Sequence, residues 1–126
     1  MARPKHVLVV DDHDAHRKIL ELTLRVPDFE VTGVRDGFEA LDYLRLHTPD
    51  AILLDVHMPG MSGLEVGVEV RRIDGMAEVP ILVMSSEVNE HVRSRAAAFG
   101  AAEVLSKPIP APHLRRRLHE LIDGGG

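Results

Sequence analysis

The sequence of 126 residues contains no cysteine, no tryptophan and a single tyrosine, and aromatic residues make up only 3% of it. The absence of cysteine excludes a disulfide framework and a zinc site with thiolate ligands. With so few aromatic rings, any core must be built from aliphatic side chains. Hydrophobic residues make up 44% and charged residues 28% of the chain, which is the balance of a soluble globular domain.

Long hydrophobic runs and an excess of basic charge are also missing. No segment approaches the roughly 20 apolar residues that span a membrane, and the opening MARPKHVLVV contains no signal-peptide core. We therefore expect a cytoplasmic protein without membrane contact. The net charge of −5 argues against direct nucleic-acid binding, which needs a basic face.

Short apolar runs rich in β-branched residues alternate with helical patterns along the chain. Each run is typical of a strand that is buried on both faces of a parallel sheet. The predicted strands are residues 6–10, 30–34, 51–55, 81–85 and 103–105. This alternation predicts an α/β fold, a doubly wound five-stranded parallel sheet with five helices on its two faces. We place the domain at residues 4–123 and interpret 124–126 as a flexible tail or the start of a linker.

The predicted helices are defined by apolar residues spaced three or four apart. These residues are Ala15, Ile19, Leu22 and Val26; Phe38, Leu41, Tyr43 and Leu44; Leu64, Val68 and Ile73; Val92, Ala96 and Phe99; and Leu114, Leu118, Leu121 and Ile122. Gly67 weakens the third helix by about 1 kcal/mol relative to alanine, and Gly100 ends the fourth. The basic cluster at residues 115–117 is expected on the solvated side of the fifth helix.

Polar residues follow the predicted strands at their carboxyl ends, where doubly wound sheets place their ligand sites. They are Asp11, Asp12, Asp55, Ser85 and Lys107. A pair of like charges 4 Å apart costs about 4 kcal/mol at an effective dielectric of 20, so protons or a cation must neutralise the three carboxylates. A set of oxygen ligands without cysteine suits a hard divalent ion such as Mg²⁺.

Lysine and a hydroxyl beside such a cation indicate phosphate chemistry. Lys107 supplies a compact positive charge that pairs with phosphate, and Ser85 can donate a hydrogen bond to a phosphoryl oxygen. Carboxylates can act as phosphoryl nucleophiles, and Asp55, alone at the end of the central apolar run, is the candidate acceptor. Catalysis would then consist mostly of positioning and charge neutralisation.

The segments VLVVDD, ILLDVHMPGMSGLE, ILVMSS and FGAAEVLSKPI, in this order and spacing over roughly residues 5–122, resemble the receiver domain of two-component response regulators. The resemblance implies strand order 2-1-3-4-5 and phosphoryl transfer to Asp55 from a sensor histidine kinase or a histidine phosphotransfer protein. It implies Mg²⁺ bound by Asp12, Asp55 and the backbone carbonyl of His57, with Asp11 acting through water. Such a domain catalyses only its own phosphorylation and dephosphorylation and is not otherwise an enzyme.

The same resemblance assigns the remaining residues of the site. Ser85 and Lys107 match the family's switch hydroxyl and its lysine, and the Lys107–Pro108 bond is expected to be cis, a state that proline makes accessible. His57 and Glu87 lie where the family tunes phosphate lifetime. The output would be a downstream target protein or an output domain, and receivers often form homodimers through the fourth helix, the fifth strand and the fifth helix.

One position departs from the family pattern. Val104 lies three residues before the lysine, where the family often carries a tyrosine or phenylalanine that reorients on activation. Switching would then depend mainly on Ser85, on residues 86–89 and on the helix after them. The departure also leaves open a degenerate receiver, which binds its partners independently of phosphorylation.

Two other interpretations use the same residues. A metal-dependent phosphohydrolase would need a substrate pocket, for which the chain has no extra domain or cap. The pattern Asp12-x-Asp14 also resembles haloacid-dehalogenase-type phosphotransferases, but His16 stands where they carry threonine or valine. His13 and His16, three residues apart, could bind a metal on one helical face, a spacing that is common in a chain with eight histidines.

Overall fold

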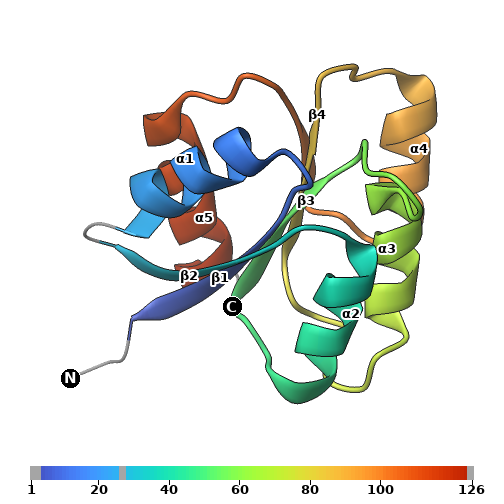
Figure 1. Ribbon diagram of the computed structural model, residues 1–126, viewed down its shortest axis with the longest axis horizontal. Coiled ribbons are helices and arrows are strands. Elements are labelled where there is room, and N and C mark those ends of the chain that lie inside the picture. The colour runs from blue at the N-terminus through green and yellow to red at the C-terminus, as the bar shows by residue number, and fades with distance from the viewer. Residues whose placement is uncertain (1–3, 26–27, 125–126) are drawn as a thin grey trace.

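The computed structural model describes residues 4–25 and 28–124 and consists of five strands, each followed by a helix (Figure 1). The strands are β1 (Lys5–Val10), β2 (Phe29–Val34), β3 (Ala51–Asp55), β4 (Ile81–Ser85) and β5 (Glu103–Ser106), and the helices are α1 (Asp14–Arg25), α2 (Gly37–Leu46), α3 (Gly63–Arg71), α4 (Glu90–Ala98) and α5 (Ala111–Asp123). All neighbouring strands pair in parallel in the order β2-β1-β3-β4-β5. The predicted fold class, strand order and strand positions are confirmed.

Helices cover both faces of the sheet. Figure 1 shows α1 and α5 on one side and α2, α3 and α4 on the other. No helix within residues 4–25 and 28–124 has the length and apolar character needed to cross a membrane. Residues 125–126 of the predicted tail or linker lie outside the described part of the chain. The interpretation of residues 124–126 therefore stays a prediction.

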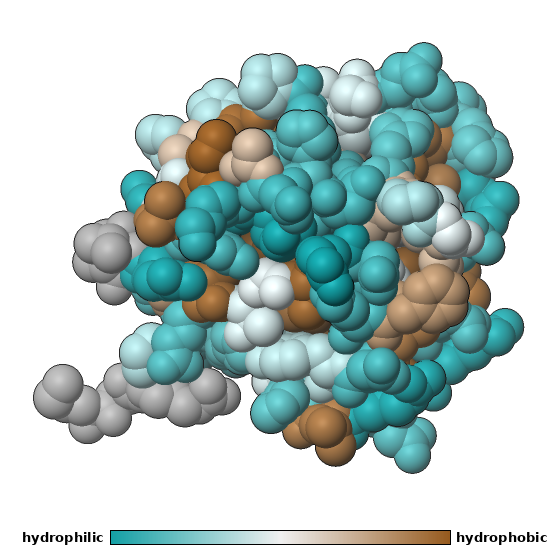
Figure 2. All heavy atoms as spheres, in the orientation of Figure 1, coloured by the Kyte–Doolittle hydropathy of each residue, from teal (hydrophilic) through white to brown (hydrophobic). Residues whose placement is uncertain are grey.

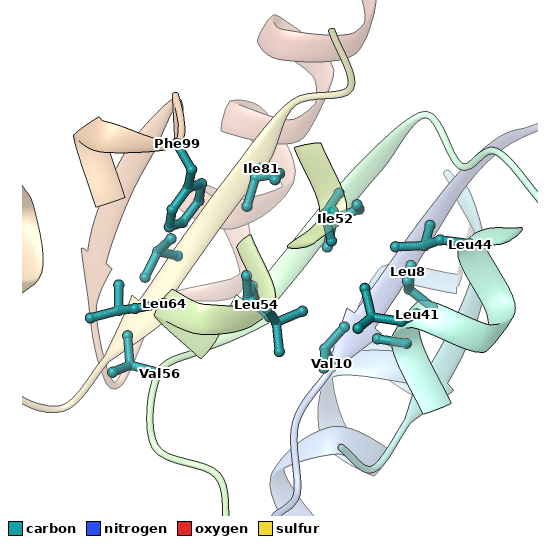
Figure 3. Close-up of a cluster of buried hydrophobic side chains, with 14 of the residues drawn as sticks. Leu8, Val10, Leu41, Leu44, Ile52, Leu54, Val56, Leu64, Ile81 and Phe99 are labelled. Carbon is teal, nitrogen blue, oxygen red and sulfur yellow. The ribbon is translucent and has the colours of Figure 1, made fainter. Parts of the chain in front are cut away.

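The core consists of two clusters, one on each face of the sheet, because successive side chains of a strand point to opposite faces. Leu8, Ile52 and Ile81 belong to the cluster beneath α2, α3 and α4 (Figure 3). Their neighbours Val7, Ala51 and Leu82 belong to the cluster beneath α1 and α5. Since both faces are covered, residues 7–10 of β1, 51–54 of β3 and 81–84 of β4 form uninterrupted apolar runs, as parallel strands in such sheets do.

Three helix starts are fixed by side-chain caps, which satisfy backbone N–H groups that lack partners in the first turn. Asp36 accepts a hydrogen bond from the backbone of Glu39 at the start of α2, and Asn89 accepts one from Val92 at the start of α4. Ser62 and Glu65 form a reciprocal capping box at the start of α3. These caps define where the loops at the carboxyl edge of the sheet end.

The face of α1 that packs on the sheet differs from the predicted one. Leu20 and Leu24 are buried, whereas Ile19 and Leu22 are 60% and 59% exposed and Ala15 is exposed; Val26 lies outside the described residues. Figure 2 shows hydrophobic atoms at the surface over α1. The helix carries two apolar stripes at helical spacing, and contacts of His16 and Arg17 with Asp11 turn the stripe of Leu20 and Leu24 inward.

The other helices follow the predicted stripes more closely. Leu41, Leu44, Leu64, Val92, Ala96, Phe99, Leu114 and Leu118 are buried, and Tyr43, Val68, Ile73, Leu121 and Ile122 are partly buried against the core. Phe38 is an exception, because it is 58% exposed. Val66 and Val70 of α3 are fully buried and were not predicted.

The basic cluster of α5 is only in part a solvated face. Arg116 is exposed, but Arg115 and Arg117 are half-buried. Arg115 pairs with Asp28, and Arg117 pairs with Glu103 of β5. These ion pairs tie α5 to β5 and to the loop before β2.

Candidate functional site

The register of the sheet brings the strand-end carboxylates together. Val10 of β1 pairs with Leu54 of β3, so the residues that follow them, Asp11 and Asp55, emerge side by side at the carboxyl edge. The strand order reverses between β1 and β3, because β1 also pairs with β2 while β3 pairs with β4. This reversal is where doubly wound sheets bind ligands.

Three carboxylates form the centre of this edge. Asp11, Asp12 and Asp55 each offer an oxygen, and these oxygens lie within 4.8 Å of one another. Asp11 and Asp55 are buried and Asp12 is exposed. At the upper limit of 4.8 Å a like-charged pair costs about 3.5 kcal/mol at an effective dielectric of 20. In the chain without a bound cation, the three carboxylates therefore repel one another, and a cation would relieve this repulsion.

Lys107 approaches the central carboxylate from the loop after β5. Its Nζ atom lies 2.9 Å from Asp55 Oδ1, and the Lys107–Pro108 peptide bond is cis, as the family resemblance implies. The backbone N–H of Lys107 donates to the carbonyl of Ser85 at 2.9 Å, which anchors this loop to the end of β4. The lysine is thus held at the site by its main chain as well as by its charge.

Asp55 combines burial with an unsatisfied oxygen. Its side chain is only 4% exposed, and although Lys107 forms an ion pair with Oδ1, no hydrogen bond of acceptable geometry reaches that oxygen. Burial raises the pKa of Asp55 above its ordinary value; the Lys107 ammonium opposes this rise, and Asp11 and Asp12 add to it. A buried carboxylate needs positive partners to offset its lost hydration, and Lys107 is one such partner here.

These residues fit a hard divalent cation. The three ligand atoms are carboxylate oxygens, and one of them belongs to a buried residue with an unsatisfied oxygen. Oxygen donors without thiolate or imidazole suit Mg²⁺. Among the described residues this is the one group of at least three histidine or carboxylate side chains close enough to share an ion. The metal-binding pair of His13 and His16 considered from the sequence is not part of it.

The loop between β3 and α3 explains why the apolar run of β3 stops at a carboxylate and turns into the segment HMPGMSG. Gly60 has a φ of +83°, a conformation that glycine adopts without strain. At Gly63 a Cβ atom would lie 2.0 Å from the backbone oxygen of Asp55, so only glycine allows α3 to start this close to the site. His57, in the same loop, is exposed.

Ser85 lies at the same edge but is engaged with its own loop. It is fully buried, and its hydroxyl donates to the carbonyl of Glu87 at 2.7 Å and accepts from the Glu87 N–H at 3.1 Å. The hydroxyl that we expected to donate to a phosphoryl group is therefore hydrogen-bonded elsewhere. To act on a ligand at Asp55, it must exchange the Glu87 carbonyl for the ligand.

Asp11 is fixed by groups around the start of α1. Its Oδ1 accepts a hydrogen bond from the backbone N–H of His13 at 2.9 Å, its Oδ2 contacts His16 Nδ1, and its backbone carbonyl accepts from Arg17 at 2.8 Å. Sequence reasoning missed the contact of His16. The spacing of five residues between Asp11 and His16 carries no signal until the rotation of α1 is known.

A groove of about 540 Å³ lies between the β3–α3 loop and the start of α4. It is lined by residues of the β3–α3 loop, including His57 and Met58, and by Glu87 and His91 near the start of α4. His57 and Glu87, which the family resemblance associates with phosphate lifetime, thus face one shared groove.

Comparison with known proteins agrees with this geometry. A family model described as the response regulator receiver domain matches residues 7–119. The polar-differentiation response regulator DivK of Brucella anthropi is 32% identical over 109 residues, which are 86% of this chain and 89% of DivK. The structure of the chemotaxis protein CheY4 of Vibrio cholerae superposes with a TM-score of 0.90 and 32% identity, covering 94% of this chain and 98% of CheY4.

The chain is similar to separate proteins and to segments of larger ones. The receiver domain of the sensor histidine kinase PA1611 of Pseudomonas aeruginosa, solved with a magnesium ion in its active-site cleft, has a TM-score of 0.88 and 27% identity, covering 96% of this chain and 99% of that domain. The chain spans only 51% of the response regulator MprA of Mycobacterium sp. (strain KMS) and 17% of the sensory/regulatory protein RpfC of Xanthomonas campestris pv. campestris. From its fold, its carboxylate cluster and the family match, the chain belongs to the family of response regulator receiver domains.

Proposed function

We propose that this chain is a phosphoacceptor domain that receives a phosphoryl group on Asp55 and changes its affinity for a partner as a result. The observation that carries this proposal is the buried Asp55 carboxylate, which has one oxygen 2.9 Å from the Lys107 ammonium and lies close to two further carboxylates. The arrangement suits a nucleophilic carboxylate in a site where Lys107 and a bound cation together would balance the negative charge of the carboxylates and the phosphoryl group.

Asp12, Asp55 and the backbone carbonyl of His57 would hold Mg²⁺, and Asp11 would act on the ion through water, by family resemblance. The magnesium ion in the cleft of the PA1611 receiver domain supports this assignment by similarity. When bound, the ion would supply positive charge toward the phosphoryl oxygens and relieve the repulsion among the carboxylates. Lys107 would balance the charge that remains on the phosphoryl group.

The transfer step needs only a nucleophile and a held phosphoryl group. An Asp55 carboxylate oxygen attacks the phosphorus of a phosphohistidine, a P–O bond forms, and the P–N bond breaks. The imidazole nitrogen keeps the electron pair of that bond and takes a proton from solvent. Asp55 must be ionised for this step, and the ion pair with Lys107 favours ionisation because it lowers the carboxyl pKa against the effect of burial. The phosphoryl donor would be a sensor histidine kinase or a histidine phosphotransfer protein.

The signal would leave the site through Ser85 and α4. A phosphoryl oxygen would compete with the Glu87 carbonyl for the Ser85 hydroxyl, which now donates to that carbonyl at 2.7 Å. This exchange would move the loop of residues 86–89 and the start of α4, because Asn89 caps that helix. A coupling of about 1–3 kcal/mol, typical of such switches, changes partner affinity roughly 5- to 150-fold. Val104, only half-buried on β5, would play a smaller part than an aromatic residue does.

The partners follow from this role. They would be the phosphoryl donor and either a downstream target protein or an output domain, with homodimers through α4, β5 and α5 as one form of output. We propose a cytoplasmic location and no direct contact with nucleic acid or membrane. Beyond its own phosphorylation and dephosphorylation, the domain would have no enzyme activity.

Incubation with acetyl phosphate and Mg²⁺, followed by intact-protein mass spectrometry, tests the proposal. We expect a gain of one phosphoryl group that is lost in Asp55→Asn and kept in Asp74→Asn, a control at an exposed aspartate of the α3–β4 loop. No gain, or a gain that survives Asp55→Asn, would overturn the assignment of Asp55. Partner affinity that is indifferent to both Asp55→Asn and Mg²⁺ would instead favour the degenerate receiver.

A further inference from the structure

Asp11 differs from the other two carboxylates of the site because both of its oxygens already have protein partners. It is fully buried. Oδ1 accepts the backbone N–H of His13 at 2.9 Å, and Oδ2 contacts Nδ1 of His16, whose side chain is 27% exposed. A carboxylate oxygen has two acceptor positions, so each oxygen can still accept a bond from a metal-bound water. The partners of Asp11 thus fix its direction without blocking it.

His16 is the one side chain among these contacts to the carboxylate. The contact from residue 13 comes from the main chain, and Arg17 donates to the backbone carbonyl of Asp11 rather than to its carboxylate. In the tautomer that carries its hydrogen on Nδ1, His16 donates to the Asp11 carboxylate, which is an acceptor. Leu20 and Leu24 of α1 pack into the core on the same side of the helix as His16. This orientation of the helix holds the His16 ring in place.

We propose that His16 is a positioning residue of the divalent-cation site, which orients Asp11 toward the ion and tightens binding without touching the ion. The inference rests on the proposed function, since it assumes that the three carboxylates hold Mg²⁺. His16 is not a ligand, because among the described residues the group close enough to share an ion contains carboxylates alone. Loss of such an outer partner typically weakens metal affinity about 10- to 100-fold.

The test is a Mg²⁺ titration of the whole ¹⁵N-labelled chain, followed by two-dimensional NMR of the backbone amides, which reports both the dissociation constant and whether each variant is folded. His16→Leu removes the donor, whereas His16→Asn places an amide nitrogen near the position of Nδ1. His13→Leu is the matched control, because the same side-chain change three residues away keeps the backbone N–H that bonds Asp11. We expect His16→Leu to weaken binding about tenfold, at the lower end of the range because Asp11 acts through water.

The other variants separate positioning from packing. We expect His16→Asn to restore most of the wild-type affinity and His13→Leu to leave it unchanged. Equal affinities for His16→Leu and wild type, or equal weakening in His16→Leu and His16→Asn, would overturn the positioning role. A wild-type chain that binds no Mg²⁺ would instead overturn the metal site itself, and with it the proposed function. A His16→Leu variant that gave the spectrum of an unfolded chain would also contradict the proposal, since the residue would then be needed for folding.

Discussion

The contact between Gly67 of α3 and Phe99 at the end of α4 allows a sharp test of the packing that positions α4. A Cβ atom at residue 67 would lie 2.3–2.5 Å from three atoms of the Phe99 ring. Phe99 is only 7% exposed, and its carbonyl accepts a hydrogen bond from Arg71 Nε at 2.8 Å. The ring therefore cannot withdraw without loss of core packing.

Two effects of Gly67→Ala oppose each other. Alanine in a helix interior gains about 1 kcal/mol over glycine, while overpacking a core costs about 1–3 kcal/mol. Since three ring atoms would be closer than 3.0 Å, we place the overpacking at the upper end of that range. We expect Gly67→Ala to lower the free energy of unfolding by about 1–2 kcal/mol.

Urea denaturation followed by far-ultraviolet circular dichroism measures this change in a chain without tryptophan. Phe99→Leu removes the three ring atoms concerned, so in that background Gly67→Ala should stabilise the protein by about 1 kcal/mol, the helix-propensity term alone. The effect of Gly67→Ala on the free energy of unfolding should thus have opposite signs in the two backgrounds. A stabilising Gly67→Ala in the wild type, or the same effect in both backgrounds, would refute the packing argument.

Two further predictions concern the half-buried Arg71 and the central carboxylate. Arg71 donates to the carbonyls of Phe99, Met76, Val79 and Gly100 at 2.7–3.0 Å. Because lysine cannot reproduce this planar fork, Arg71→Lys should lower the free energy of unfolding in urea by about 2 kcal/mol. The same change at exposed Arg72 should cost less than about 0.5 kcal/mol, and equal effects at the two positions would contradict this role of Arg71. Burial raises the pKa of Asp55 above its ordinary value of 3.8, and the Lys107 ammonium opposes this rise. The stability that the raised pKa contributes is therefore fully present below pH 3.8 and is lost as the pH rises through the raised pKa. Asp55→Asn should therefore raise the urea midpoint at pH 7 without Mg²⁺, by an amount that shrinks as pH falls toward 4; a lower midpoint at pH 7 would refute the sign.

The strands and the edge that holds the site could be predicted because each depends on a local pattern. Uninterrupted apolar runs mark β1, β3 and β4 as buried on both faces, and each run stops where the chain becomes polar. Parallel strands place their carboxyl ends at one edge, so Asp11, Asp55 and Lys107 could be grouped before any contact was known. The register that brings Asp11 beside Asp55 then follows from the pairing of β1 with β3.

The orientation of α1 could not be predicted, because two apolar stripes share that helix. Ile19 and Leu22 fit helical periodicity as well as Leu20 and Leu24 do, and nothing in the spacing decides between them. The decision lies in the contacts of His16 and Arg17 with Asp11, which hydrophobic periodicity does not contain. For the same reason, neither the contact of His16 with Asp11 nor the hydrogen bond from the Ser85 hydroxyl to Glu87 could be predicted from the sequence.

The central claim, that Asp55 is the phosphoryl acceptor, is tested most directly by chemical trapping. Borohydride reduces an acyl phosphate to an alcohol, so an aspartate that has accepted a phosphoryl group becomes homoserine and can be located by peptide mass spectrometry. After incubation with acetyl phosphate, we predict homoserine at position 55 in the presence of Mg²⁺ and its loss when the metal is chelated. Homoserine at Asp11 or Asp12 instead, or at no aspartate under either condition, would contradict the account.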